Sequence, residues 1–158
     1  MDKLWAPWRS KYIYMRKRKR CIFCGNAKPD AARDKARYIV NRSKHAFSIL
    51  NLYPYNNGHI MVAPFRHVAD LEHLTADELM DMIQLVTRDK KLLDKKLKPQ
   101  GYNIGINIGK VSGAGYDGHI HIHIVPRWTG DTNYMTVTAG MKIVSESLDV
   151  LYKLLKTK

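Results

Sequence analysis

The chain has 158 residues, 45% of them hydrophobic and 26% charged, which is the composition of one ordinary globular domain. No apolar run approaches the roughly 20 residues needed to cross a bilayer, and the N-terminus has no apolar signal core, so we expect a cytoplasmic protein without a membrane segment. The formal net charge of +13 attracts polyanions, but charge alone does not distinguish a polyphosphate from a nucleic acid.

The first segment, residues 1–20, combines tryptophan and tyrosine side chains with an unbroken basic run at residues 16–20. Flexible arms rarely carry so many aromatic residues, so we expect the aromatic part to pack on the body or on a partner subunit. The basic run is predicted to stay solvated. Residues 1–20 are thus predicted to form an anchored arm, and residues 21–158 a single domain.

Cys21 and Cys24 are the only cysteines and are separated by two residues. This spacing suits a tetrahedral zinc knuckle whose tight turn is closed by Gly25. The alternative is a pair of free or redox-active thiols, although a redox motif needs a strand-to-helix context that is absent here. A zinc knuckle would need two further ligands, and the seven histidines are the candidates.

Three segments rich in β-branched, aromatic and apolar residues are predicted strands, at residues 38–42, 46–50 and 59–63. Short links between them imply an antiparallel sheet. Asn51 lies at the exit of the second strand, just before Pro54. Its side chain could bond ribose hydroxyls or simply complete a turn.

Residues 75–78 form a capping box, so a long helix is predicted to begin there. Apolar residues recur at helical spacing as far as Leu97, and Pro99 and Gly101 end the pattern. A last helix with one apolar face is predicted after a cap at Ser145. We therefore predict an α+β domain, an antiparallel sheet of about five strands with a long central helix and a C-terminal helix.

The segment 101–109 repeats the triplet Asn-Ile-Gly and is a predicted strand. Glycine weakens a strand unless something approaches its backbone closely, and a nucleotide could be that group. The following loop, residues 110–115, offers a lysine and backbone amides that can hold phosphate, a weak signal by itself. The candidate phosphate contacts are Asn107, Lys110, Ser112 and Gly113.

His119, His121 and His123 alternate with isoleucines, so an extended strand would place the imidazoles in a row on one face, roughly 6.5 to 7 Å apart. Such a row could be a half-buried strand, a three-histidine metal site, or a site of nucleophilic chemistry. The metal interpretation lacks a nearby carboxylate ligand. Neutral imidazole, with an unperturbed pKa of about 6.5, can attack phosphorus without a separate base, which makes the flanked His121 the candidate nucleophile.

Residues 119–125 resemble the histidine triad signature of nucleotide hydrolases and transferases, a histidine alternating with hydrophobic residues. Further motifs extend the resemblance to the bacterial branch similar to diadenosine polyphosphate phosphorylases, at residues 4–9, 21–24, 51–59, 101–105 and 126–133. The resemblance implies a histidine triad (HIT)-like fold, a homodimer, and zinc held by Cys21, Cys24, His67 and His119.

The resemblance also implies catalytic roles. His121 would form a nucleotidyl-histidine, His123 would donate to the phosphoryl oxygens, and His119 would fix the strand or ligate zinc. Asn51 would contact ribose. Arg127 could hold a distal phosphate and Trp128 could stack on a base, or both could simply pack and solvate their loop.

The activity implied is phosphorolysis of an adenine dinucleotide polyphosphate, with inorganic phosphate as acceptor and ADP and ATP as products. If water is the acceptor, the protein is instead a hydrolase that releases AMP. The residues do not fix whether a divalent cation accompanies the substrate. A zinc-knuckle nucleic-acid-binding protein is the alternative from another class, although a binding module has no use for a row of three histidines.

Overall fold

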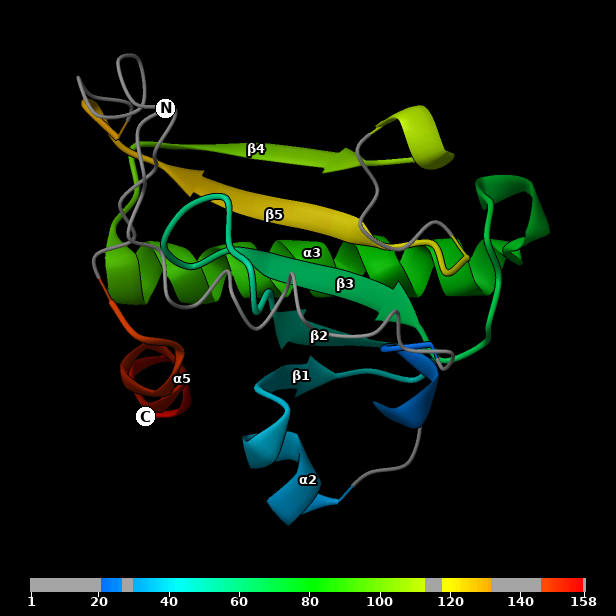
Figure 1. Ribbon diagram of the computed structural model, residues 1–158, viewed down its shortest axis with the longest axis horizontal. Coiled ribbons are helices and arrows are strands. Elements are labelled where there is room, and N and C mark those ends of the chain that lie inside the picture. Colours follow the sequence, from blue (N-terminus) through cyan, green and yellow to red (C-terminus); the bar gives the residue numbers. More distant parts are fainter. Residues whose placement is uncertain (1–20, 27–29, 113–117, 132–145, 158) are drawn as a thin grey trace, which may run out of the picture.

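The computed structural model describes residues 21–26, 30–112, 118–131 and 146–157. The predicted arm, residues 1–20, and Gly113 lie outside these ranges. In the described part, five antiparallel strands form one sheet in the order β1-β2-β3-β5-β4 (Figure 1). The strands are β1 (Ile39–Arg42), β2 (Ala46–Leu50), β3 (Ile60–Pro64), β4 (Gly101–Ile106) and β5 (Ile122–Arg127).

One long helix, α3 (Ala76–Leu97), runs along one face of the sheet and connects β3 to β4 (Figure 1). Alternate strand residues point toward α3, as the period of two requires, and they form the main core with the apolar stripe of the helix. The buried side chains of this core include Leu50, Ile60, Ile124, Met82 and Leu93. Two shorter helices, α2 (Ala31–Ala36) and α5 (Leu148–Lys156), complete the described α-helices, so the predicted α+β architecture is confirmed.

Among the described residues, no helix combines the length and apolar character that a membrane span requires.

The predicted capping box begins α3, and an ion pair reinforces it. The Thr75 hydroxyl accepts from the Glu78 N–H at 3.2 Å, and the Glu78 carboxylate accepts from the Thr75 N–H at 2.9 Å. Arg66 donates to both oxygens of the same carboxylate, at 2.9 and 2.7 Å. These bonds, that from Arg66 above all, lower the pKa of Glu78 to about 2. The loop after β3 is thereby tied to the start of α3.

Replacing Glu78 with glutamine is expected to lower the free energy of unfolding by about 1 kcal/mol at neutral pH, because the cap weakens and a half-exposed arginine loses its partner. The folded pKa of Glu78 lies below its unfolded value of about 4.3, so this stabilisation is present above that pH and disappears as the pH falls toward 2. Urea titrations of both proteins at pH 7 and pH 3 measure the difference. The exposed Glu72→Gln is the matched control, and a Glu78→Gln effect that persists undiminished at pH 3 would contradict the assignment.

The histidine-rich strand begins later than predicted. The prediction placed all three histidines in it, but β5 starts at Ile122, so His119 and His121 precede it. The backbone N–H of Ile120 donates to the Val68 carbonyl at 2.7 Å instead of to a neighbouring strand. Across the sheet, β3 ends at Pro64, which has no N–H to offer a ladder.

Two further differences concern helix ends. The cap of α5 is Ser147, whose hydroxyl accepts from the Val150 N–H at 3.3 Å, whereas the predicted cap, Ser145, lies outside the described residues. The six-residue α2 was not predicted, because it is too short to show helical periodicity. Its N-cap Asp30 accepts from two backbone N–H groups and was the available sequence signal.

Candidate active site and metal centre

The histidines gather on the face of the sheet opposite α3, and they form a cluster instead of a row. The ring centroids of His121 and His123 are 4.7 Å apart with the rings at 69°, closer than the roughly 6.5 to 7 Å that separates the backbones of alternate strand positions. The departure from the prediction follows from the late start of β5, which leaves the backbone around His121 outside the ladder. The three imidazoles predicted from the sequence are all buried, with exposed fractions of 1% for His119, 3% for His121 and 8% for His123.

A fourth imidazole, His59, joins the cluster from the residue before β3. Its Nε2 lies 2.8 Å from His123 Nδ1 in a buried contact. The backbone N–H of Tyr55 donates to His59 Nδ1 at 3.0 Å, so that nitrogen is an acceptor and the proton of His59 is on Nε2. His59 therefore donates to His123 Nδ1, and His123 carries its own proton on Nε2. This chain of bonds presents a donor at His123 Nε2.

Sequence reasoning gave His59 no role, although a signal was present. The β3–β5 register pairs Met61 with His123. Residues 59 and 61 are two positions apart, so in an extended backbone their side chains point to the same face of the sheet. A histidine at that position therefore points to the face that carries His123. The signal could be used only once β3 was known to lie beside β5, which the order of strands along the chain does not reveal.

His121 is held in the tautomer a nucleophile needs. Its Nδ1 lies 2.9 Å from the carbonyl oxygen of His119, and a carbonyl only accepts, so Nδ1 carries the proton. The lone pair on Nε2 is therefore free of a proton. Burial lowers the pKa of His121, lowers that of His123 to about 4 and lowers that of His59 to about 3. All three imidazoles are neutral at pH 7.

Replacing His59 with leucine is expected to lower turnover about 100-fold, because His123 loses the donor that fixes its tautomer. The Michaelis constant should change little, since His59 is buried beneath Tyr55 and His123. Steady-state kinetics and a thermal melt of His59→Leu and His59→Gln measure the effect, the glutamine retaining an N–H donor. Equal loss in both variants without loss of stability would contradict a donor role.

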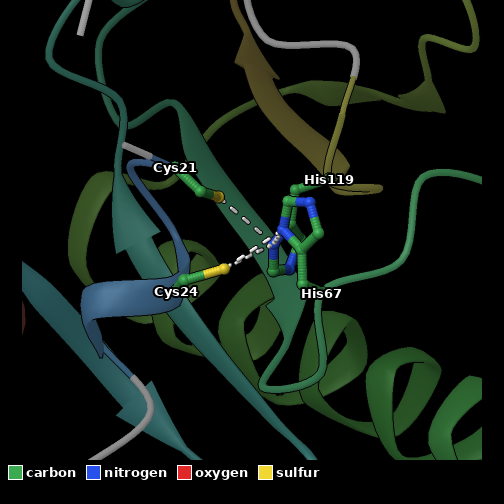
Figure 2. A group of neighbouring side chains, drawn as sticks. All are labelled: Cys21, Cys24, His67 and His119. Atoms are coloured by element: carbon green, nitrogen blue, oxygen red, sulfur yellow. Dashed lines mark hydrogen bonds between the residues drawn. The ribbon is translucent and has the colours of Figure 1, made fainter. Parts of the chain in front are cut away.

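Four side chains from three distant segments converge on a second centre beside the histidine cluster (Figure 2). Cys21 and Cys24 come from the knuckle, His67 from the loop after β3, and His119 from the approach to β5. Their ligand atoms all lie within 4.8 Å of one another. The predicted ligand set is thus brought together as a candidate two-cysteine, two-histidine metal site.

The spacing of these atoms fits zinc. Zinc–sulfur bonds of about 2.3 Å and zinc–nitrogen bonds of about 2.0 to 2.1 Å at tetrahedral angles separate two nitrogens by about 3.3 Å and nitrogen from sulfur by about 3.6 Å. His67 Nδ1 and His119 Nδ1 are 3.2 Å apart. Sulfur–nitrogen distances are 3.4 Å from Cys21 to His119, 3.1 Å from Cys24 to His67 and 3.7 Å from Cys24 to His119.

The tautomer of His119 also suits metal binding. Its Nε2 lies 3.0 Å from the carbonyl oxygen of Pro64, which can only accept, so Nε2 carries the proton and Nδ1 presents a lone pair to the centre. Four protein ligands would close the coordination shell, as in a structural zinc site. A zinc ion held in this way would have no coordination position left for substrate or water.

Of the predicted substrate contacts, two lie against the histidine cluster. The Asn107 amide nitrogen is 3.5 Å from His123 Nε2, and exchanging the nitrogen and oxygen of this amide turns the oxygen, an acceptor, toward the Nε2–H. Asn51 accepts from the Tyr53 N–H at 2.9 Å, which is the turn alternative, and its amide nitrogen also lies 3.2 Å from His59 Nδ1.

The remaining predicted substrate contacts in the described part of the chain come after Asn107 in the sequence. Exposed Ser112 donates to the Gly109 carbonyl at 2.7 Å in the turn Lys110–Ser112. Arg127 pairs with Asp131 at 2.6 Å and bonds Asn103, four residues beyond His123 on β5. The Trp128 N–H donates to the same Asp131 carboxylate. Their roles toward substrate stay predictions.

The HIT domain family matches residues 32–130. A protein named AP-4-A phosphorylase from Mycobacterium tuberculosis is 34% identical over 164 residues, covering 100% of this chain and 84% of that protein.

Two solved structures have the same fold. A zinc-bound histidine triad family protein from Mycobacterium smegmatis superposes with a TM-score of 0.67 at 25% identity, covering 86% of this chain and 90% of that one. A histidine triad nucleotide-binding protein from Sulfolobus tokodaii gives a TM-score of 0.66 at 26% identity, with 85% and 89% covered.

Proposed function

Because the chain belongs to the HIT domain family, we propose that it is a nucleotidyltransferase that cleaves adenine dinucleotide polyphosphates by phosphorolysis through His121. The observation that carries the proposal is the pair of opposite groups at the histidine cluster. His121 presents an unprotonated Nε2, and the neighbouring His123 presents an Nε2–H donor. A nucleophile beside a hydrogen-bond donor is what displacement at phosphorus requires.

In the first step, the lone pair of His121 Nε2 forms a bond to the α-phosphorus as the phosphorus–oxygen bond to the polyphosphate breaks. From diadenosine tetraphosphate this step releases ATP and leaves an adenylyl group on His121. The imidazole then carries a positive charge, which the His119 carbonyl stabilises through the Nδ1–H bond of 2.9 Å. His123 Nε2–H stabilises the charge that develops on the phosphoryl oxygens or the leaving oxygen.

In the second step, an oxygen of inorganic phosphate attacks the same phosphorus, and the nitrogen–phosphorus bond breaks. The products are ADP and a regenerated neutral His121. Phosphate is proposed over water because of the similarity to the Mycobacterium tuberculosis protein, which spans this whole chain. The net charge of +13 is consistent with retaining a second anion.

Zinc in the site formed by Cys21, Cys24, His67 and His119 belongs to the proposal as a structural ion. The fit of the ligand spacing supports it, as does the zinc-bound relative from Mycobacterium smegmatis. A homodimer, which the resemblance implies, stays a prediction.

The acceptor is tested by incubating the protein with diadenosine tetraphosphate and ³²P-labelled inorganic phosphate, followed by chromatography. We expect labelled ADP and unlabelled ATP in equal amounts, because the new phosphate becomes the β-phosphate of ADP. Omitting phosphate should stop ADP formation. Unlabelled AMP produced at the same rate with and without phosphate would identify water as the acceptor and overturn the phosphorylase proposal.

A further inference from the structure

Phe23 lies inside the cysteine knuckle, between the two sulfur ligands, and its side chain is 1% exposed. Its backbone is fixed by the knuckle, because the Phe23 N–H donates to Cys21 Sγ at 3.4 Å and its carbonyl accepts from the Asn26 N–H at 2.9 Å. Where the knuckle is placed therefore determines where the Phe23 ring is placed.

The Phe23 ring lies against two imidazoles. Its centroid is 5.1 Å from that of His119, the candidate metal ligand, and 4.8 Å from that of His121, the proposed nucleophile. The rings of Phe23 and His121 are inclined by 35°, a tilted contact between two aromatic rings. An aromatic ring thus spans from the candidate metal centre to the reacting histidine.

His121 needs such a support. Its imidazole is oriented by the bond from Nδ1 to the His119 carbonyl and meets His123 edge-on. One hydrogen bond leaves a ring able to rock about the bonded nitrogen, whereas attack at phosphorus needs Nε2 in line with the bond that breaks. The Phe23 ring packs against the His121 imidazole, in addition to the edge-on contact that His121 makes with His123. The Phe23 contact therefore restricts this rocking.

We propose that Phe23 is a positioning residue, through which the knuckle of Cys21 and Cys24 holds the His121 imidazole in its reactive orientation. The proposal rests on the assignment of His121 as nucleophile, and it adds a coupling between the metal centre and the reaction. A bound metal would fix the knuckle against His67 and His119 and thus press the Phe23 ring onto His121. The metal would then act on the reaction without touching substrate.

The competing explanation is that Phe23 only fills space. It belongs to a small apolar cluster with Ile39, Phe47, Met61 and Ala63, against which Ile49 packs. If space filling were its whole role, removing bulk elsewhere in this cluster would have the same effect on turnover as removing the Phe23 ring.

The test compares Phe23→Leu with Phe23→Tyr, which keeps the ring, and with Ile49→Ala as the matched cluster control. For Phe23→Leu we expect one metal ion per chain, an unchanged Michaelis constant, and kcat lowered about 10- to 100-fold through slower formation of the nucleotidyl-histidine. Phe23→Tyr should stay within about threefold of the wild type, and so should Ile49→Ala. An unchanged kcat in Phe23→Leu, an equal loss in Ile49→Ala, or a raised Michaelis constant alone overturns the proposal.

The coupling to the metal centre is tested by combining Phe23→Leu with Cys24→Ser. Because both changes release the same contact, the double variant should lose no more kcat than the more damaging single variant. Multiplicative losses would show independent roles and overturn the coupling.

A measurement without substrate separates this proposal from the proposed function. In the NMR spectrum of the substrate-free protein, the ring protons of His121 feel the Phe23 ring current. Phe23→Leu and metal removal should both shift these signals, and re-addition of zinc should reverse the second shift. If the wild type fails to cleave dinucleotides but these shifts appear, the proposed function fails and the positioning role stands; unchanged His121 signals overturn the role.

Discussion

Replacement of His121 by asparagine is expected to lower kcat for dinucleotide cleavage about 10⁴-fold, because the amide cannot form the covalent intermediate. Substrate binding should persist, since the other imidazoles and loop amides remain. The variant should also fold normally, as asparagine is smaller than histidine and its amide can still donate to the His119 carbonyl. Rapid-quench kinetics and a thermal melt measure both properties.

Direct detection of the nucleotidyl-histidine intermediate is a more specific test of the nucleophile than the loss of kcat. Mass spectrometry of wild-type protein quenched early in turnover should find one nucleotidyl group per active site, attached at residue 121 and labile to acid as a phosphorus–nitrogen bond is. His73→Asn makes the same chemical change at an exposed histidine and should form the adduct at the wild-type rate. An active protein without any adduct, or an adduct on His123, would contradict the assignment of the nucleophile.

Loss of the metal from the candidate zinc site should strongly lower the thermal stability of the protein. When the free zinc concentration is about a thousand times the dissociation constant, binding stabilises the native state by about 4 kcal/mol. For a chain of this size, that stabilisation raises the melting temperature by about 10 °C. Treatment with a chelator, or Cys24→Ser, should therefore lower the melting temperature by this order. Elemental analysis should show one zinc per chain before treatment and none after it.

The decisive control is recovery. Zinc added back should restore the melting temperature of the chelator-treated wild type but not that of Cys24→Ser. Magnesium should restore neither, because thiolate and imidazole ligands suit zinc and not hard cations. A wild-type protein that contains no zinc and is indifferent to the chelator would contradict the metal assignment.

The fold was largely predictable because local signals agree with the tertiary structure. The strand Ala46–Leu50 was predicted at its observed bounds, and the capping box at Thr75 marked the start of α3. Both rest on short-range chemistry, β-branched and apolar residues in one case and a side chain that accepts a nearby N–H in the other. The cap of α5 was misplaced by two residues because serines stand at both 145 and 147, and the choice depends on where the helix packs.

The candidate site was less predictable because its geometry depends on contacts across the sheet. The alternation at residues 119–125 correctly separates His123 from Ile122 and Ile124, which pack toward α3. The alternation cannot show that the strand begins only at Ile122. That depends on the pairing with β3, whose register would place Pro64, a residue without an N–H, opposite Ile120. The contribution of His59 likewise depends on β3 lying beside β5.

The candidate metal site joins Cys21 to His119 across 98 positions of the chain, which has a consequence for the order of assembly. Closing so long a loop carries a large entropic cost, and the site is complete only after β3 and β5 have paired. During synthesis the knuckle leaves the ribosome long before its histidine partners exist. We therefore expect the four-ligand site to be complete only after the sheet has formed, so that zinc would stabilise the folded chain and would not nucleate its folding.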